Sequence, residues 1–447
     1  MQAAANTYLK YIDLTILENW DVQGLLDAKF NCSDKYESAR IGDFLIKSRH
    51  AVNIEDGKTY NRIAVKINNR GVVPRGTEKG VNIRTKKRYR AKAGQFIISE
   101  KGIENGAFGI IPEELDQVIV TNAFSLFDVN AKKINPQFLL LAASAKARIK
   151  RVQKGSRRAN SQRMDAFLNQ KIPLPKLEEQ DKIASNFLNK ANEAERLKNE
   201  AEDLKNKIKR FVLKELGLDG NDKKQRTKSK KLQTVNYSDL VKWGGDFIGV
   251  KNNGNGIYKE VSVHELCQVG GGGTPSRNRK EYYEGGNIPW IKTGELNNEI
   301  LFDTKEKITE EALKNSGAKL YKKGSIVIAM YGATIGKTAK LGLDASVNQA
   351  CAVLFDINNS IVLADYLWEY LQTQRANLKK RAYGNAQPNL NARIISNYPI
   401  PMPSIEKQKE IVDKIMSIKK EVKKLEKKSA ELKQEAKMQF EKTIFNS

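Results

Sequence analysis

The sequence predicts an α+β fold. It comprises two globular mixed α/β domains, related by internal duplication and joined by two long antiparallel coiled-coil helices. Two observations indicate this fold. The segment IPLPKLEEQDKI at 172–183 recurs 228 residues later as IPMPSIEKQKEI at 400–411, with six of twelve positions identical. A charged stretch of helical periodicity follows each copy, and short β-rich runs with glycine turns precede it. Solenoid repeats are only about 20–50 residues long, so the repeated unit is a domain with its helix.

The domain boundaries follow from the repeat. The expected order is a first globular domain at 1–172, a first helix at 173–216, a basic linker at 217–234, a second globular domain at 235–400 and a second helix at 401–447. A glycine at 217 is a typical helix stop. The proline pair that opens each helical region ends the preceding element, because residues before proline favour extended conformations.

The repeat continues into the globular halves. The first half offers a run RIGDFL, a strand after a Gly turn, a glycine loop, a second strand and an amphipathic helix, and the second half offers the same elements in the same order. The matched ranges are 40–45 with 262–267, 94–99 with 324–329, 102–106 with 332–336, 124–130 with 352–358, and 138–149 with 366–378.

Both helical regions carry apolar residues at alternating spacings of four and three, which is typical of a coiled-coil seam. One polar residue, Ser429, interrupts the second seam. A helix with one seam needs one partner, and the simplest partner is the helix of the other copy. Two separate surface helices, each on its own domain, remain the alternative. The predicted seam residues are Phe187, Leu197, Leu204, Ile208, Ile411, Ile415, Ile418, Val422, Leu425 and Leu432.

The charge balance favours a polyanionic partner. The chain of 447 residues has a net charge of +26, and residues 1–172 alone carry 30 Lys and Arg against 17 Asp and Glu. Basic proteins gain affinity for nucleic acid by neutralising phosphates and releasing counterions. Charge that only aids solubility and a membrane-surface patch are the alternatives. Nucleic acid is favoured because no basic amphipathic helix with a broad apolar face is present.

Other classes of protein find little support. No apolar run reaches the about 18 residues of a membrane span, and the N-terminus lacks the pattern of a secretory signal. The three cysteines are far apart and form neither a disulfide framework nor a zinc pattern. We therefore expect a protein of the reduced cytoplasm without a metal site.

Apparent catalytic motifs fail on spacing. The stretch GATIGKT at 332–338 has three residues between its glycines, where a phosphate-binding P-loop needs four. The tetrapeptide NPQF at 135–138 lacks the second proline of adenine methyltransferases and is better interpreted as a turn that starts a helix. The chain has only two histidines, so a catalytic site based on histidine is not expected. We expect no enzyme, although a carboxylate pair hidden among the many acidic residues remains open.

Basic clusters with interspersed Asn, Gln and Tyr recur in both halves. Arg and Lys bind phosphates and guanine edges, and Asn and Gln pair with adenine. The predicted DNA-binding residues are Arg84, Lys86, Lys87, Arg88, Arg90, Arg157, Arg158, Arg163, Ser276, Arg277, Arg279, Lys280, Tyr331, Thr334, Lys337, Gln349, Arg381, Asn385 and Gln387. For each cluster, a solvated charged face without a ligand is the alternative.

Several motifs together make the chain resemble a DNA specificity subunit of type I restriction–modification systems. They are GGGGTPS at 270–276, IPWI at 288–291, GSIV with YGATIG at 324–336, NQA at 348–350 and the IPxPxxExQ helix entry at 400–408. The first half departs from this pattern, because it has no GGTPS and its glycine loop is KGIENG.

The resemblance implies two target recognition domains that each read half of a split DNA sequence. It also implies two methyltransferase subunits and ATP-driven restriction subunits as partners in a bacterial or archaeal cytoplasm. S-adenosylmethionine, ATP and Mg would then be bound by the partners, with no cofactor on this chain. A coiled-coil scaffold and a stand-alone DNA-modification or nuclease fragment are the alternatives. The target bases and the spacer length do not follow from the sequence.

Overall fold

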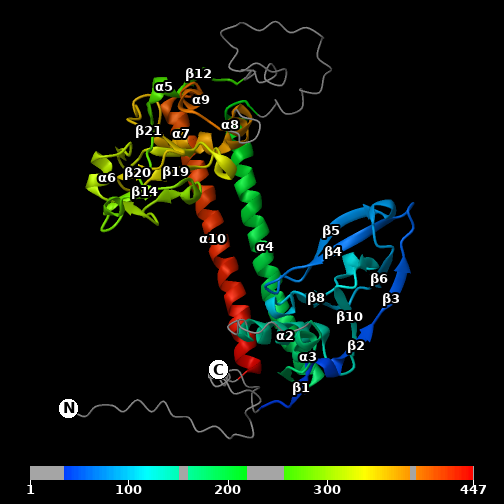
Figure 1. Ribbon diagram of the computed structural model, residues 1–447. Helices are drawn as coiled ribbons and strands as arrows, with labels where there is room; N and C mark the ends of the chain where they lie inside the picture. Colours follow the sequence, from blue (N-terminus) through cyan, green and yellow to red (C-terminus); the bar gives the residue numbers. More distant parts are fainter. Residues whose placement is uncertain (1–34, 151–159, 219–255, 383–388, 446–447) are drawn as a thin grey trace, which may run out of the picture. The chain divides into compact units, whose positions relative to one another are not determined.

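The computed structural model describes residues 35–150, 160–218, 256–382 and 389–445. The chain divides into two compact units (Figure 1). Unit 1 comprises Met1–Leu197 with Lys427–Ser447, and unit 2 comprises Lys198–Glu426. Each unit therefore contains a globular part and one half of each long helix. Most of the predicted linker, 219–234, lies outside the described residues.

Unit 1 is a layered α+β structure. Its first sheet has the strand order β2-β10-β7-β8 and is antiparallel throughout. The second sheet, β3-β6-β9-β4-β5, is antiparallel except for the parallel pair β4–β9. The strands are β1 (Ser38–Arg40), β2 (Leu45–Ser48), β3 (His50–Asn53), β4 (Thr59–Val65), β5 (Val72–Lys79), β6 (Lys87–Ala91), β7 (Phe96–Ser99), β8 (Phe108–Ile110), β9 (Val118–Val120), β10 (Phe124–Val129) and β11 (Lys171–Pro173).

Alternation along the strands of the first sheet builds two apolar cores in unit 1. Phe96 and Phe127 face the helices α2 (Pro136–Lys150) and α3 (Asn160–Leu168). Ile97 and Leu126 face the second sheet. Successive side chains of a strand point to opposite faces, so one sheet supplies both layers.

Unit 2 repeats this arrangement. The strand order is β13-β21-β18-β19-β15 in its first sheet and β16-β14-β20-β17 in its second. The strands are β12 (Glu260–Ser262), β13 (Gln268–Gly271), β14 (Ile288–Ile291), β15 (Ile300–Leu301), β16 (Lys307–Ile308), β17 (Leu320–Tyr321), β18 (Ile326–Ala329), β19 (Thr338–Leu341), β20 (Ala345–Val347), β21 (Cys351–Phe355) and β22 (Pro399–Pro401). The helices are α5 (Val263–Leu266), α6 (Glu310–Lys314), α7 (Ala364–Thr373), α8 (Arg375–Arg381) and α9 (Ala392–Ser396).

The predicted duplication is confirmed in the entry to each unit. Ser38 pairs with Pro173 in the sheet β1–β11, and Glu260 pairs with Pro401 in the sheet β12–β22. A single helical turn follows each first strand. In unit 1 the Arg40 N–H donates to Asp43 Oδ2 at 3.0 Å, and in unit 2 the Ser262 N–H donates to Glu265 Oε1 at 2.9 Å. The same local hydrogen bond thus starts both copies.

The glycine turns also agree. Gly94 and Gly324 have φ of 80° and 93°, in the left-handed region that favours glycine, and each precedes a buried strand. The loops at 102–106 and 332–336 each form one 3-10 turn, and the glycines that end them, Gly106 and Gly336, both have φ of 71°.

One correspondence differs from the match of the sequence letters by one residue. Aligning FSLFDVN with AVLFDIN places Phe127 opposite Phe355. In the sheets, however, Phe127 pairs with Phe96 and Leu354 pairs with Ile326, each partner lying two residues after its turn glycine. Leu354 is therefore the structural equivalent of Phe127, and Phe355 points to the other face. A shift of one residue in a strand exchanges its faces.

The two long helices are α4 (Leu177–Glu215) and α10 (Ile405–Ile444). Both begin four residues after the proline that opened the predicted helical region, because Pro173 and Pro401 lie in strands. Gly217 ends the first helix region with φ of 67°, as predicted.

The helices run antiparallel in both units. In unit 1, Lys190 near the start of α4 bonds to Glu435 and Gln439 near the end of α10. In unit 2, Glu215 at the end of α4 pairs with Lys407 at the start of α10 at 2.7 Å. The polar interruption of the seam has a partner too, because Ser429 Oγ donates to the Ala194 carbonyl at 2.6 Å.

Half of the predicted seam residues are buried and half are half-buried. The buried ones are Leu197, Ile411, Ile415, Val422 and Leu425, and the half-buried ones are Phe187, Leu204, Ile208, Ile418 and Leu432. Phe187 makes an edge contact with Phe440 of α10 at 5.9 Å between ring centroids, within unit 1. Ile208 joins the core that contains Ile411 and Ile415, within unit 2.

The repeated glutamine of the IPxPxxExQ motif explains why the motif recurs. Gln180 and Gln408 are buried, with exposures of 1% and 0%. Gln408 Oε1 accepts the N–H of Leu363, the residue before α7, at 2.8 Å, and its amide donates to the carbonyls of Pro403 and Ile361. Gln180 likewise accepts the N–H of Asn135 and donates to Pro175. Each glutamine ties the start of a long helix to the start of a domain helix.

A buried ion pair adds a second tie in unit 2. Lys419 of α10 donates to Glu369 of α7 at 2.6 Å, and the Glu369 side chain is only 3% exposed. Burial raises the pKa of Glu369, and the charge of Lys419 opposes that rise.

We predict that Gln408→Leu lowers the free energy of unfolding of unit 2 by about 2–4 kcal/mol. The substitution leaves a buried backbone N–H and two carbonyls without their partner, and each such group costs about 1–3 kcal/mol. Urea unfolding followed by tryptophan fluorescence measures the change, since Trp290 and Trp368 are buried in this unit. Lys424→Leu, at an exposed position of α10 in the same unit, is the control. An equal effect of both variants would contradict the role of the buried glutamine.

We predict that Lys419→Met destabilises unit 2 by about 3 kcal/mol at neutral pH, because it leaves a buried carboxylate unpaired. Without the cation, the pKa of Glu369 in the folded state rises further. The loss should shrink as the pH falls from the raised pKa of the folded state toward 4.5, the ordinary pKa of glutamate, and should be smallest below 4.5, where the carboxyl is protonated in both states. Unfolding at several pH values, with the exposed Lys420→Met as control, tests this. A loss that does not vary with pH would refute it.

Candidate nucleic-acid interface

Three loops of unit 2 meet at one end of its first sheet, here called the loop end. Gly271 of β13 pairs with Ala352 of β21, and Ala329 of β18 pairs with Cys351. The segments that continue beyond these pairs are 272–279, 348–350 and 331–337. Met330 N–H donates to the Ala350 carbonyl at 2.8 Å, which joins two of the loops. Of the predicted residues, these three loops carry Ser276, Arg277, Arg279, Tyr331, Thr334, Lys337 and Gln349, and Lys280 follows the first loop.

Close backbone packing explains the last two glycines of the run at 270–273. A Cβ on Gly272 would overlap the carbonyl oxygens of Val347 and Asn348, and one on Gly273 would overlap the backbone at Gly317 and Ala318. Thr274 Oγ1 bonds to Gln349 Oε1 across the same contact. The glycines therefore hold the loop that carries the predicted Ser276 and Arg277 against the loop that carries Gln349.

Aromatic residues fasten the following segment. Trp290 Nε1 donates to the Gly273 carbonyl at 3.0 Å, and Tyr283 Oη donates to the Pro275 carbonyl at 2.5 Å. The guanidinium of Arg277 lies 4.3 Å from the ring centroid of Tyr283 and 5.2 Å from that of Trp290. Arg279 bonds to the Tyr282 hydroxyl at 3.0 Å. The predicted Arg277 and Arg279 thus contact fixed aromatic side chains, and Tyr282, Tyr283 and Trp290 are here called the platform.

One carboxylate joins the cations of this platform. Glu306 pairs with Arg277 Nη2 at 2.5 Å and with Lys292 Nζ. Hydrogen bonds from Lys292 and Arg277 lower the pKa of Glu306, so it stays ionised at neutral pH. Burial raises the pKa of Tyr283, which stays a neutral hydrogen-bond donor.

The glycine loop at 332–336 is supported by an arginine that sequence reasoning missed. Arg375 of α8 donates through Nε to the Ile335 carbonyl at 3.2 Å and through Nη2 to the Ala333 carbonyl at 3.1 Å. Thr334 Oγ1 donates to the Tyr331 carbonyl, so this predicted residue caps its own loop. No motif in the sequence pointed to Arg375, Trp290, Lys292 or Glu306 as a group, since only folding brings them together.

The other predicted residues of unit 2, and the predicted residues of unit 1 at 157–163, lie in different places. Arg381 lies at the end of α8 and stacks on Tyr398, with 4.8 Å to the ring centroid. Arg163 is half-buried in α3 of unit 1. Arg157, Arg158, Asn385 and Gln387 lie outside the described residues.

The first predicted cluster of unit 1 lies on and before β6. Arg84 is exposed, and Lys86 bonds to Asp56 and to the Gly80 carbonyl. Within β6, Tyr89 packs toward the core, so Arg88 and Arg90 project from the opposite face, and Lys87 at the start of the strand is exposed. On the same face of this sheet as Arg88 and Arg90, Arg62 of β4 pairs with Glu78 of β5. Unit 1 therefore presents its arginines on a sheet face and unit 2 on loops.

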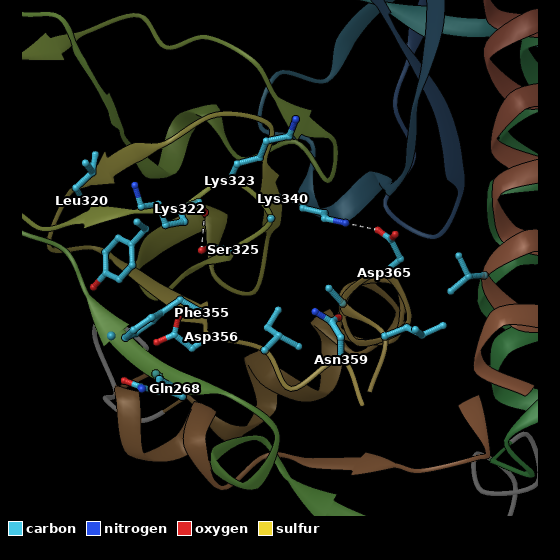
Figure 2. A pocket seen from close by; sticks show the side chains of 18 of the residues that line it. Gln268, Leu320, Lys322, Lys323, Ser325, Lys340, Phe355, Asp356, Asn359 and Asp365 are labelled. Atoms are coloured by element: carbon cyan, nitrogen blue, oxygen red, sulfur yellow. Dashed lines mark hydrogen bonds and ion pairs between the residues drawn. The ribbon is translucent and has the colours of Figure 1, made fainter. Parts of the chain in front are cut away.

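A groove lies at the other end of the first sheet of unit 2 (Figure 2). Its volume is about 1190 Å³, and it is lined by Gln268 at the start of β13, Phe355 at the end of β21, and Ser325 before β18. Lys340 and Asp365 form an ion pair of 2.6 Å at its side. None of the predicted DNA-binding residues lines this groove, so the loop end and the groove are separate features of unit 2.

Both cysteines among the described residues are buried. Burial raises the pKa of the Cys267 and Cys351 thiols to about 12, so both stay protonated. Within these residues no group of three His, Cys, Asp or Glu side chains is placed to hold a metal ion. No helix in the described part of the chain is long and apolar enough to cross a membrane.

Comparison with known families identifies the class of protein. The family model "Type I restriction modification DNA specificity domain" matches residues 33–210 and again 255–434. The chain therefore belongs to this family, with one copy of the domain in each half. The resemblance predicted from the motifs is confirmed.

Individual relatives carry corresponding names. The specificity subunit of the type I restriction enzyme EcoR124I/EcoR124II of Escherichia coli is 28% identical over 162 residues, which cover 34% of this chain and 40% of that protein. The MjaIX specificity subunit of Methanocaldococcus jannaschii is 32% identical over 154 residues, covering 33% and 35%. The chain thus spans less than half of the length of either relative in these alignments.

Solved structures share the fold. A structure described under the complex assembly and conformational transition of the type I R-M system has a TM-score of 0.54 at 17% identity, covering 92% of this chain and 97% of that chain. The S subunit of the type I system from M. genitalium has a TM-score of 0.50 at 13% identity, covering 93% and 98%. The predicted two-domain architecture with two long helices is confirmed.

We predict that Gly272→Ala destabilises unit 2 by about 2 kcal/mol and displaces the loop that carries Arg277, because the added methyl group overlaps backbone that cannot give way. Gly271→Ala is the matched control, since nothing lies within 4 Å of its Cβ position. Thermal unfolding of both variants measures the difference, and an intact Gly272→Ala protein would show that the close packing is not required.

Proposed function

We propose that this chain is the DNA-recognition subunit of a type I restriction–modification complex. Unit 1 and unit 2 each read one half of a bipartite double-stranded DNA site. The observation that carries the proposal is the duplication itself: the same strand order, turn glycines and buried glutamine recur, while the surfaces that bear the arginines differ. Two similar frames with different reading surfaces suit two unlike half-sites. The basic net charge of +26 supplies affinity for phosphates.

The chemistry would be supplied by partner proteins. In this proposal two methyltransferase subunits and ATP-driven restriction subunits bind S-adenosylmethionine, ATP and Mg, and this chain acts in the cytoplasm without a cofactor of its own. Co-expression with a type I methyltransferase subunit, followed by mapping of methylated adenines, tests it. Methylation at one bipartite sequence, dependent on this chain, is the expected result. Methylation or cleavage by this chain alone would instead favour a stand-alone enzyme.

We predict that exchange of residues 238–398 for the matching segment of another family member changes one half of the methylated sequence and leaves the other half unchanged. The second reading domain lies within this segment, whereas the first lies before it. Methylome sequencing of cells with the chimera gives the readout. Changes in both halves would show that the two units do not read independently.

We predict that deletion of one heptad from each long helix, residues 198–204 and 420–426, shortens the non-contacted spacer and preserves both half-sites. Seven residues span about 10 Å of helix at about 1.5 Å per residue and keep the seam in phase. The predicted apolar contacts on either side of the deletion then stay in register. Altered half-sites at an unchanged spacer would contradict the role of the helices as a ruler.

A further inference from the structure

Arg277 on the platform of unit 2 is exposed to solvent and is nevertheless held by several contacts. The Arg277 side chain is 53% exposed, yet its guanidinium contacts two aromatic rings and one carboxylate. Its neighbour Arg279 contacts a single ring, that of Tyr282, whereas Ser276 and Lys280 are exposed residues for which no such support is seen. The support is anchored in the core, because Trp290 is 1% exposed and its N–H holds the loop backbone at Gly273.

Preorganisation of this kind matters for one class of contact. A free arginine side chain loses about 2 kcal/mol of rotamer entropy when it is fixed, and a stacked one has already lost part of it. A bidentate contact with O6 and N7 of guanine needs a fixed guanidinium plane. A phosphate contact is less demanding in orientation and chiefly needs charge.

The negative charge of Glu306 beside Arg277 also favours a contact of this arginine with a base over a contact with a phosphate. Glu306 engages Nη2 of Arg277 at 2.5 Å and offsets its charge. An ionised carboxylate at this distance weakens attraction to phosphate oxygens, whereas the edge of a base pair carries no net charge. The remaining guanidinium N–H groups keep their fork geometry.

Resting on the proposed function, we propose that Arg277 reads a guanine in the half-site of unit 2 and that Glu306 is the residue that positions it. Tyr283 and Trp290 fix the plane of the guanidinium, and Glu306 fixes its rotation within that plane. Lys292 shares the carboxylate and limits where Glu306 can move. Arg277 is thereby a specificity-determining residue, while Glu306 acts through it.

The test measures discrimination at each base pair of the wild-type site, with the full chain in complex with its methyltransferase partner. Arg277→Ala should lower discrimination about 10- to 100-fold at one guanine of the unit 2 half-site, in line with the worth of one bidentate contact. The unit 1 half-site and the affinity for unrelated DNA should stay unchanged. Arg210→Ala, an exposed arginine on α4 in the same unit, is the matched control.

Glu306→Gln should lower discrimination at the same base pair, by a smaller factor. Combined with Arg277→Ala it should have no further effect, because its action passes through that arginine. Tyr283→Phe, which keeps the ring but removes the bond to Pro275, should retain most of the discrimination. Glu311→Gln on α6, an exposed glutamate, controls for loss of charge. Unfolding midpoints of all variants separate these effects from loss of fold.

Three results would overturn the inference. Uniform weakening by Arg277→Ala across all sequences, with a salt slope reduced by about 1, identifies a phosphate contact. An effect of Glu306→Gln that persists without Arg277 identifies a structural role for the glutamate. Unchanged discrimination in Arg277→Ala shows that the arginine does not read DNA. A wild-type complex without any sequence preference would instead refute the proposed function, so the two failures are distinguishable.

Discussion

The buried glutamine at the start of each long helix is the constraint on which the architecture of each unit depends. A helix N-terminus leaves backbone N–H groups without partners, and a strand that ends at a proline leaves carbonyls unpaired nearby. Gln180 and Gln408 satisfy both kinds of group at once, with exposures of 1% and 0%. Because an amide has a donor and an acceptor side, no apolar residue and no carboxylate can replace it. The long helix and the domain helix therefore start from one shared point.

This shared point leaves other parts of the two units free to differ. Strand pairing fixes the entry, as Ser38 with Pro173 and Glu260 with Pro401, and the glutamine fixes the exit into the helix. Between these fixed points the second sheets keep corresponding strand pairs but differ in strand length. Unit 1 places a long β4–β5 hairpin where unit 2 has the short strands β14 and β16. The frame is kept by backbone hydrogen bonds and buried polar groups, so the exposed loops and sheet faces are free to diverge.

Much of this frame follows from the sequence, and the reasons for the misses are physical. The turn glycines at 94 and 324 and the stop at Gly217 are local features that lie where they were predicted, whereas each long helix begins four residues after its predicted start. The equivalence of Phe127 with Leu354 was not predictable, since similar letters align as well one residue away and only the hydrogen-bond register decides between them. The predicted basic clusters located Arg277 but not its partners. Glu306 and Trp290 are distant in sequence and meet only because β14 pairs with β16.

The loop end shows how a divergent surface can still be rigid. Gly272 and Gly273 bring backbone against backbone, a contact that does not depend on the identity of neighbouring side chains. Trp290 and Tyr283 then bond to carbonyls of the loop, in addition to their ring contacts with the Arg277 side chain. Arg375 does the same for the loop at 332–336. Because these hydrogen bonds go to main-chain carbonyls, the side chains that project from the loops can vary without loss of the bonds. A loop surface built in this way can change its exposed side chains while its main-chain geometry stays constant.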